Sequence, residues 1–550
     1  MKKLYLVTTS FDEERQGSKT DCRIDDTPNS HYTMGIPYLE SYLEKYNSNC
    51  LVSTAYLNGV EYNESMKRIK KDLSSFSPDV VGISMVAHSR FSSFRLIDYL
   101  EKNYPTVKIL VGGVHVGGAY SAILKRYNKV IACIGEGEIV LSKLMNAFED
   151  DTPLSDIPGV AYFEDGEVKK NALPELISDL DRLPFPKHES FLVPGRTQAN
   201  MLTSRGCPLK CSFCMLDILS RRNVRYRSAK NVVDEIEHLL AINPNLKEVW
   251  FHDDAFMINK KVTEELCDEI IRRGVHKKGL YFVCSARFSS VEDNLVGKMV
   301  EAGFTHILLG LESGADEVMR KMNKKITKKM VMDSVKVLSN HKIKITLFLI
   351  VGLEGETARS VKETAKFVQE LQGVHYFLMD DFAVANVYPG TELYEVAKRE
   401  KMHVEGYGPI DDDFWAEDNE VPKFTVENSL DVMNEWKQEM MDTISFTQVT
   451  AGRPSAFLKQ RKLFPGLIEF AWNWQFAVVT HPMIQILQQN GQLISTIVED
   501  YFAGNDNIKS LMAKNMEERY VQQIIGSMAP KEREEFLQEY TEQHALAVTG

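Results

Sequence analysis

Short apolar runs alternate with amphipathic stretches along residues 1–145. The apolar runs are rich in valine and isoleucine, which is typical of strands that are buried on both faces. The stretches between them repeat apolar residues with helical spacing. This alternation predicts an α/β domain with a doubly wound, Rossmann-like parallel sheet, whose ligands bind at the carboxyl ends of the strands. The predicted strands are LYLVTT (4–9), LVSTAYL (51–57), VVGISMV (80–86), KILVGGV (108–114) and VIACIGEGE (130–138).

Three further regions follow this domain. Residues 146–197 are rich in proline and contain a predicted hairpin around Asp165, so they are interpreted as a linker. Residues 198–395 again alternate strands with helices, and six such units predict a partial barrel. Residues 396–550 are predicted to be mostly helical, with helices at 429–441, 483–501 and 531–541. The strands of the barrel are expected near 200–204, 247–252, 280–285, 305–311, 344–351 and 381–387.

Composition places the chain among folded proteins with small-molecule ligands. A hydrophobic fraction of 44% and a charged fraction of 26% are ordinary for globular domains. The net charge of −12 offers no general attraction to nucleic acid, and the basic run at 320–329 is interpreted as a solvated face. The apolar stretch 467–487 is interrupted by polar residues and is not a plausible membrane span, and the short first apolar run is no signal peptide. We therefore expect a cytoplasmic protein without a transmembrane segment.

Glycine and polar residues follow the strands of the first domain. At these positions glycine either lets the backbone approach a bulky ligand or simply makes a turn, and the sequence leaves both readings open. His88 and His115 lie in the same loops and are either ligand contacts or ordinary loop residues. The candidate residues are Gly82, Ser84, His88, Gly112, Gly113, His115, Gly135, Glu136 and Gly137.

Three cysteines are crowded into one loop after the first strand of the predicted barrel. Eight cysteines in 550 residues are too few for a disulfide framework, so this crowding indicates a metal centre. Thiolates at Cys207, Cys211 and Cys214 can ligate three irons of a 4Fe-4S cluster and leave the fourth iron open. A structural zinc site is the alternative, although zinc prefers paired Cys-x-x-Cys motifs and a fourth ligand nearby.

The sequence Cys-x-x-x-Cys-x-x-Cys after a barrel strand resembles the radical S-adenosylmethionine superfamily. The resemblance implies a partial (β/α)6 TIM-type barrel, a 4Fe-4S cluster and S-adenosylmethionine bound to the open iron. Phe213 matches the aromatic residue near the adenine, and Asp253 and Asp254 stand where relatives carry Gly-Gly-Glu. The resemblance further implies contacts with S-adenosylmethionine from Arg287, Glu312, Ser313 and Gly352, which follow later barrel strands.

The first domain and its junction to the cysteine loop resemble the cobalamin-binding radical subfamily. The matching segments are Gly-Ile-Ser at 82–84, Val-Gly-Gly-Val-His at 111–115 and Gly-Glu-Gly-Glu at 135–138. The resemblance implies that the candidate residues after these strands contact cobalamin. The cobalt-ligating motif Asp-x-His-x-x-Gly is missing, as it is in most members of the subfamily.

Together these resemblances imply a C-methyltransferase that methylates an unactivated carbon by means of a 5′-deoxyadenosyl radical and methylcobalamin. An external one-electron reductant, such as a flavodoxin or ferredoxin, would supply the electron. One alternative is a cobalamin-associated radical cyclase or rearrangement enzyme for a large apolar substrate, porphyrin-like or lipid-like. Another is a non-catalytic sensor that binds a corrinoid and an iron–sulfur cluster. Four tryptophans either line a substrate chamber, face a membrane or pack in a helical core: Trp415, Trp436, Trp472 and Trp474.

Overall fold

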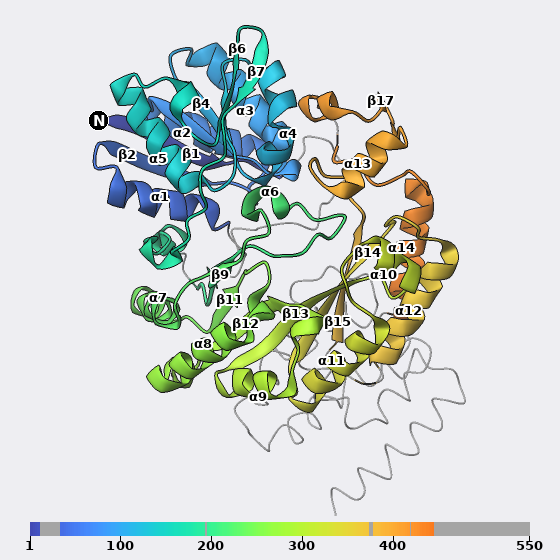
Figure 1. Cartoon of the computed structure of the whole chain (residues 1–550). Helices are drawn as coiled ribbons and strands as arrows, with labels where there is room; N and C mark the ends of the chain where they lie inside the picture. The colour runs from blue at the N-terminus through green and yellow to red at the C-terminus, as the bar shows by residue number, and fades with distance from the viewer. Residues whose placement is uncertain (12–32, 193–194, 373, 375–377, 419, 445–550) are drawn as a thin grey trace, which may run out of the picture.

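The computed structural model describes residues 1–11, 33–192, 195–372, 374, 378–418 and 420–444. It contains two large sheets, a mainly parallel one in the first domain and a parallel one in the barrel that follows it (Figure 1). The predicted helices at 483–501 and 531–541, with Trp472 and Trp474, lie outside the described residues. No helix of the described segments combines the length and the apolar character that crossing a bilayer requires.

The first sheet has the strand order β2-β1-β3-β4-β5-β6-β7. Strands β1 to β5 run parallel, and β1 is buried almost throughout because helices cover both faces of the sheet. The predicted doubly wound sheet is therefore confirmed. Its strands are β1 (Lys2–Thr8), β2 (Cys50–Tyr56), β3 (Val80–Ser84), β4 (Lys108–Gly112) and β5 (Ile131–Cys133). Its helices are α1 (Gly35–Tyr46), α2 (Tyr62–Phe76), α3 (Arg90–Asn103), α4 (Val114–Arg126) and α5 (Gly137–Asp150).

The predicted hairpin after the first domain is present and extends this sheet. Strand β6 (Val160–Glu164) pairs antiparallel with β5, and β7 (Glu167–Lys170) pairs with β6. Asp165 and Gly166 form the turn with positive φ values, a conformation that Asp-Gly turns favour. The first part of the predicted linker thus belongs to the sheet of the first domain.

The second sheet contains six parallel strands in the order β15-β14-β13-β12-β11-β8, as expected for a partial barrel. Buried and partly buried residues alternate strictly along β14, because one face packs against helices and the other lines the inside of the barrel. The strands are β8 (Gln198–Met201), β11 (Glu248–Phe251), β12 (Tyr281–Ala286), β13 (Phe304–Glu312), β14 (Lys344–Val351) and β15 (Leu378–Val384). The covering helices are α7 (Ala229–Ile242), α8 (Lys260–Arg273), α9 (Asp293–Glu301), α11 (Lys328–Asn340) and α12 (Ala358–Gln372).

Aromatic packing forms the core between the barrel strands and their helices. The rings of Phe251 and Phe282 stack with centroids 5.6 Å apart, and Phe304 lies 5.3 Å from Phe282. All three side chains are buried, and aromatic pairs in offset geometry add stabilisation beyond the area that they bury. This packing holds β11, β12 and β13 together. Phe282 and Phe304 lie near the starts of their strands, whereas the candidate site residues stand at the carboxyl ends.

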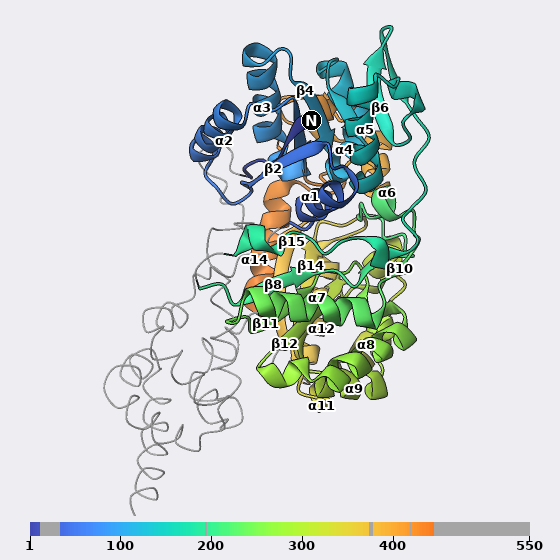
Figure 2. The ribbon, with the colours of Figure 1, turned by 90° about the vertical axis from the view of Figure 1, so that its left-hand side faces the viewer.

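Shorter elements connect the two sheets and continue the chain beyond the barrel. After the barrel, the described part of the last region carries one long helix, α14, and two short strands. Figure 2 shows the first domain above the barrel, with α14 passing close to β15. These elements are β9 (Ser204–Arg205), α6 (Asp217–Ser220), β10 (Arg225–Tyr226), α10 (Asp316–Lys321), α13 (Glu392–Arg399), β16 (His403–Val404), β17 (Gly408–Pro409), η8 (Asp412–Ala416) and α14 (Leu430–Ile444).

Candidate cofactor-binding site

The cysteine loop is held on both sides by neighbouring parts of the barrel. Gly206 has a φ of +100°, and a Cβ there would lie 2.1 Å from the backbone oxygen of Asn223, so only glycine fits. The amide of Gly206 donates to the Asp254 carboxylate at 2.9 Å. The Ser212 amide donates to the Met322 carbonyl at 3.1 Å, which fastens the loop to the segment after α10.

The three thiols of this loop have the chemistry that an iron–sulfur cluster needs. Cys207, Cys211 and Cys214 are partly exposed and form no disulfide. Burial raises the pKa of all three thiols, that of Cys214 to about 11. For Cys207 and Cys211 the positive charges of Arg287 and Lys324 oppose this rise. Two cations beside the loop suit a site that carries several thiolates. Among the described residues, no three or more His, Cys, Asp or Glu side chains converge as ligands of a single metal ion.

Asp253 and Asp254 organise the base of the cysteine loop. Asp253 is buried, and its carboxylate accepts hydrogen bonds from the Thr203 amide at 3.0 Å and from the Ser204 hydroxyl at 2.5 Å. Burial raises the pKa of Asp253 to about 6 even though these hydrogen bonds oppose the shift. Both aspartates therefore join the end of β11 to the loop, and Asp253 has little hydrogen-bonding capacity left for a ligand.

Charged residues gather beside the thiols at the ends of the next strands. Arg287 follows β12 and donates to the Lys324 carbonyl at 2.6 Å. The Lys324 ammonium forms an ion pair with Glu312, which ends β13 in the left-handed conformation at a φ of +65°. The sequence interpretation missed Lys324, although the signal was present in the basic run at 320–329.

The remaining residues predicted to contact S-adenosylmethionine lie in different surroundings. Ser313 is fully buried and shares a hydrogen bond of 3.1 Å with the Thr364 hydroxyl. Gly352 has a φ of +89°, and a Cβ there would lie 2.1 Å from the Met433 sulfur of α14. Phe213 is partly buried against the core. The contacts of these residues with S-adenosylmethionine stay predictions.

Glu356, in the turn after β14, gives a testable pH dependence. Burial raises its pKa from 4.5 to about 7. The unfolded chain releases this proton at a lower pH than the folded protein does, so the stability that the neutral carboxyl contributes is lost as the pH rises towards 7. We expect the free energy of unfolding of Glu356→Gln, relative to that of the parent protein, to rise by on the order of 2 kcal/mol between about pH 5 and about pH 8. Anaerobic thermal unfolding of both proteins measures this, and an equal difference at the two pH values would contradict it.

The residues predicted to contact cobalamin divide into two groups. Some are glycine because the protein packs closely around them. A Cβ on Gly82 would lie 2.6 Å from the Leu6 side chain, and one on Gly113 would lie 2.6 Å from the Met85 carbonyl. A Cβ on Gly137 would meet Leu39 at 3.0 Å. The others border space at the strand ends. A Cβ on Gly112 would make only ordinary contacts, a Cβ on Gly135 would meet nothing within 4 Å, and Ser84 is partly exposed.

The two candidate histidines point in different directions. The Nε2 atom of His88 lies 3.2 Å from the Tyr388 hydroxyl, which follows β15 in the barrel. His115 is fully buried at the start of α4, where its ring packs edge-on against Trp415 at 5.3 Å. Trp415 is therefore buried against the first domain, and not within a helical core of the last region as the core interpretation of the tryptophans expected. Burial lowers the pKa of both histidines, so each is neutral at neutral pH.

Glu136 and Glu138 bind arginines of the barrel. The Arg205 guanidinium lies 2.6 Å from Glu138 and 3.3 Å from Glu136, and Arg225 lies 2.7 Å from Glu136. Burial alone would raise the pKa of Glu136, but the two arginines hold it below its usual value. We call these four side chains the interdomain ion cluster. It joins the loop after β5 and the start of α5 to β9 and β10, the two short strands that precede and follow the cysteine loop.

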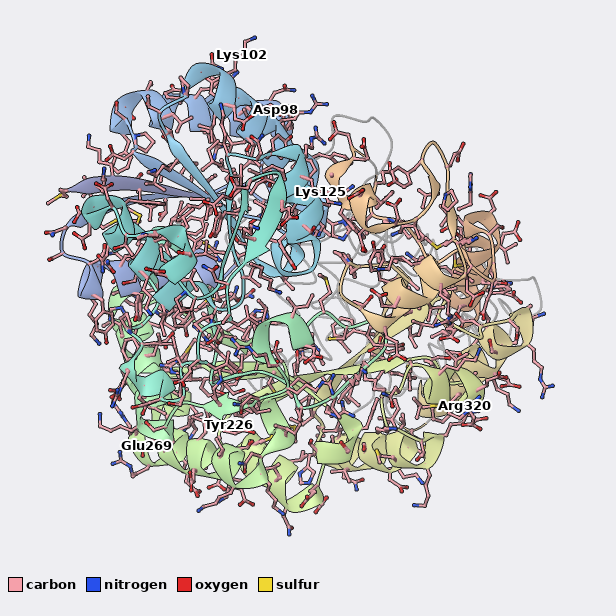
Figure 3. The ribbon with its side chains drawn as sticks, turned by 45° about the horizontal axis from the view of Figure 1, so that its top comes forward. Asp98, Lys102, Lys125, Tyr226, Glu269 and Arg320 are labelled. Atoms are coloured by element: carbon pink, nitrogen blue, oxygen red, sulfur yellow. The ribbon has the colours of Figure 1, made fainter. Side chains whose placement is uncertain are left out.

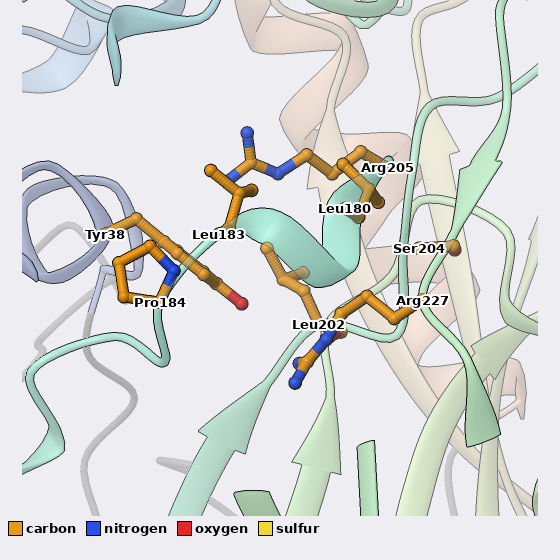
Figure 4. Close-up of a pocket in the computed structure, with 8 residues that line it drawn as sticks. All are labelled: Tyr38, Leu180, Leu183, Pro184, Leu202, Ser204, Arg205 and Arg227. Atoms are coloured by element: carbon orange, nitrogen blue, oxygen red, sulfur yellow. The ribbon is translucent and has the colours of Figure 1, made fainter. Parts of the chain in front are cut away.

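A small pocket lies beside this ion cluster (Figure 4). Its volume of about 10 Å³ is enough for a single water molecule. It is therefore not a site for a cofactor. Its lining residues are Tyr38, Leu180, Leu183, Pro184, Leu202, Ser204, Arg205 and Arg227.

Comparisons with known proteins agree with this two-part arrangement. The Radical SAM superfamily model matches residues 201–368, and the B12 binding domain model matches residues 22–145. An uncharacterized methyltransferase of Pyrococcus horikoshii is 26% identical over 66% of this chain and 78% of the relative. The anaerobic magnesium-protoporphyrin IX monomethyl ester cyclase of Rubrivivax gelatinosus is also 26% identical, over 66% of this chain and 65% of the cyclase.

A solved structure shares the fold. The cobalamin-dependent S-adenosylmethionine radical enzyme OxsB, with aqua-cobalamin and S-adenosylmethionine bound, superimposes with a TM-score of 0.66 at 16% identity. The match covers 100% of this chain and 80% of OxsB. The matches to the two family models, together with the two sheets, define the protein as an α/β enzyme in which a B12-binding domain is joined to a radical SAM half-barrel. The chain belongs to the cobalamin-binding radical S-adenosylmethionine enzymes, whose cofactors are a 4Fe-4S cluster, S-adenosylmethionine and cobalamin.

Proposed function

We propose that this enzyme is a C-methyltransferase that acts on an unactivated carbon of a small molecule. The observation that carries the proposal is the direct contact between the two strand-end faces. His88 after β3 meets Tyr388 after β15, and Glu136 after β5 meets Arg225. Ligands of parallel sheets bind at such strand ends, so a substrate between the faces has both cofactors as neighbours.

When bound, the cluster and S-adenosylmethionine supply a 5′-deoxyadenosyl radical, and methylcobalamin supplies the methyl group. Arg287 is the proposed partner of the S-adenosylmethionine carboxylate, because a guanidinium can bind a carboxylate through two parallel hydrogen bonds. Glu312 is the proposed partner of the ammonium group, and Phe213 that of the adenine. Each of these side chains lies in the cysteine loop or at the end of a barrel strand. Their part is to orient the reacting groups and to exclude water.

The proposed cobalamin contacts are the residues that border space at the strand ends of the first sheet. Gly112, Gly135 and Ser84 leave room there for a bulky ring, and His88 lies at the same edge. Gly82, Gly113, His115, Glu136 and Gly137 would act mainly by shaping these loops, since their surroundings are protein atoms. We further propose a cytoplasmic location, a small-molecule substrate rather than a nucleic acid, and an external one-electron reductant.

Product analysis with labelled S-adenosylmethionine tests the reaction. We expect the anaerobically reconstituted enzyme to contain iron and cobalt, to form 5′-deoxyadenosine upon reduction, and to transfer a trideuterated methyl group intact to its product. The similarity to the Rubrivivax gelatinosus cyclase favours a cyclase or rearrangement enzyme as the second candidate. A product with a rearranged skeleton and no added carbon would select that candidate. Cofactor binding without 5′-deoxyadenosine would select the sensor instead.

A further inference from the structure

The basic run at 320–329 lies directly against the cysteine loop. Its first residues end α10, and the chain then turns at Asn323, next to the cysteine loop. The Asn323 side chain donates to the Lys210 carbonyl at 2.8 Å, and the Ser212 amide donates to the Met322 carbonyl. The run and the loop therefore form one continuous surface at the edge of the proposed cluster site.

Three cations of this surface are exposed and form no ion pair with any residue that the structure describes. They are Lys210 in the cysteine loop, Arg320 in α10 and Lys325 beyond it, and we call them the basic surface. Figure 3 shows Arg320 at the periphery of the barrel. Many other exposed cations are neutralised within their own helix, as Lys230 is by Asp234 and Arg359 by Glu363. Asp316 and Glu317 lie in the first turn of the same short helix, four and three residues before Arg320, but neither forms an ion pair with Arg320 among the described residues.

What sets the basic surface apart is its place beside the cysteine loop, on a chain whose net charge is −12. The overall charge repels an acidic protein, whereas a local cluster of opposite charge attracts it and orients it during the encounter. Such steering directs an acidic partner to one place on this enzyme, beside the thiols of Cys207 and Cys211. A partner seated there is well placed to exchange electrons with a cluster held by these thiols.

We propose that Lys210, Arg320 and Lys325 form the docking surface for an acidic one-electron carrier protein. This inference rests on the proposed function, because it assigns the route by which the cluster is reduced. The carrier loses one electron and the cluster gains it, and no covalent bond forms or breaks. Lys324 belongs to the ion pair with Glu312 and is not part of the basic surface.

Charge reversal with two electron donors tests this assignment. The variant carries Lys210→Glu, Arg320→Glu and Lys325→Glu in the reconstituted full-length enzyme. Its matched control carries Lys102→Glu, Lys277→Glu and Lys278→Glu, which change the net charge equally at exposed sites away from the loop. Lys102 lies on the first domain, far from Arg320 (Figure 3). Stopped-flow absorbance follows reduction of the cluster by a reduced acidic flavodoxin and, separately, by reduced methyl viologen.

We expect the second-order rate constant with flavodoxin to fall at least about tenfold at low ionic strength and to lose most of its salt dependence. The control should retain most of the parent rate, and reduction by the cationic viologen should not be slowed in either variant. An unchanged flavodoxin rate, an equal loss in the control, or an equal loss with viologen would overturn the docking surface. Failure of the proposed function would be distinct, because the parent enzyme would then form no 5′-deoxyadenosine with viologen.

Discussion

Replacing Cys207, Cys211 and Cys214 together with alanine is expected to abolish both the iron–sulfur cluster and 5′-deoxyadenosine formation. The three thiols are the donors that the cysteine loop offers to iron, and Arg287 and Lys324 provide the positive charge beside them. Without these donors no iron is held in the loop, so S-adenosylmethionine has no metal to bind. Iron analysis and visible absorbance after anaerobic reconstitution measure the first loss. A nucleoside assay under reduction measures the second.

Two comparisons make this experiment decisive. Cys50→Ala removes a partly exposed thiol in the first sheet, remote from the loop, and should leave iron content and nucleoside formation unchanged. The triple variant should also retain its far-ultraviolet circular dichroism, because the cysteines lie outside the helices and strands. Retention of iron by the triple variant would refute the assignment. Zinc in the anaerobically prepared parent protein would do the same.

The strands and their order along the chain are predictable from the sequence because they depend on local patterns. The run KITLFLIV is predicted as a strand from its apolar content, and polar and apolar residues alternate over its first four positions. Its last four residues are all apolar, so the alternation of buried and partly buried residues along the whole of β14 is only half visible in the sequence. The valine-rich run of β3 is buried on both faces, as its lack of alternation predicts. The cysteine loop is also a local signal, since its three thiols lie in one short segment. Patterns of this kind predict whether a residue is buried or exposed, but they do not predict which residues it contacts.

The partners themselves depend on contacts between distant segments. His88 and Tyr388 are 300 residues apart in the chain, and Glu136 and Arg225 are 89 apart. Nothing in the Gly-Glu-Gly-Glu motif distinguishes a carboxylate that faces a cofactor from one that two arginines neutralise. Asp253 is a similar case, because its buried hydrogen bonds to Thr203 and Ser204 arise only when β11 pairs beside β8. The polar residues of the site could be predicted as a set, whereas their individual roles required the structure.

Breaking the interdomain ion cluster is expected to be the most destabilising of the substitutions considered. Arg205→Ala leaves the Glu138 carboxylate, whose side chain is 5% exposed, without its partner. Removing one member of a buried ion pair costs about 3–5 kcal/mol, because the remaining charge stays desolvated. Arg205 also packs over the Tyr38 ring at 4.9 Å, and this contact is lost as well. Anaerobic thermal unfolding should show a midpoint several degrees below that of the parent protein.

A double-mutant cycle separates this effect from a general loss of packing. Glu138→Ala alone should also be costly, and the double variant should be clearly less destabilised than the sum of the two single variants. The exposed pair Arg359 and Glu363 is the matched control, and Arg359→Ala should change stability by less than about 0.5 kcal/mol. Additive effects at Arg205 and Glu138 would show that the two charges do not stabilise each other. The join between the first domain and the segment of the cysteine loop would then have to rest on packing such as that of α4 against α6, where Gly117 lies next to Ile218.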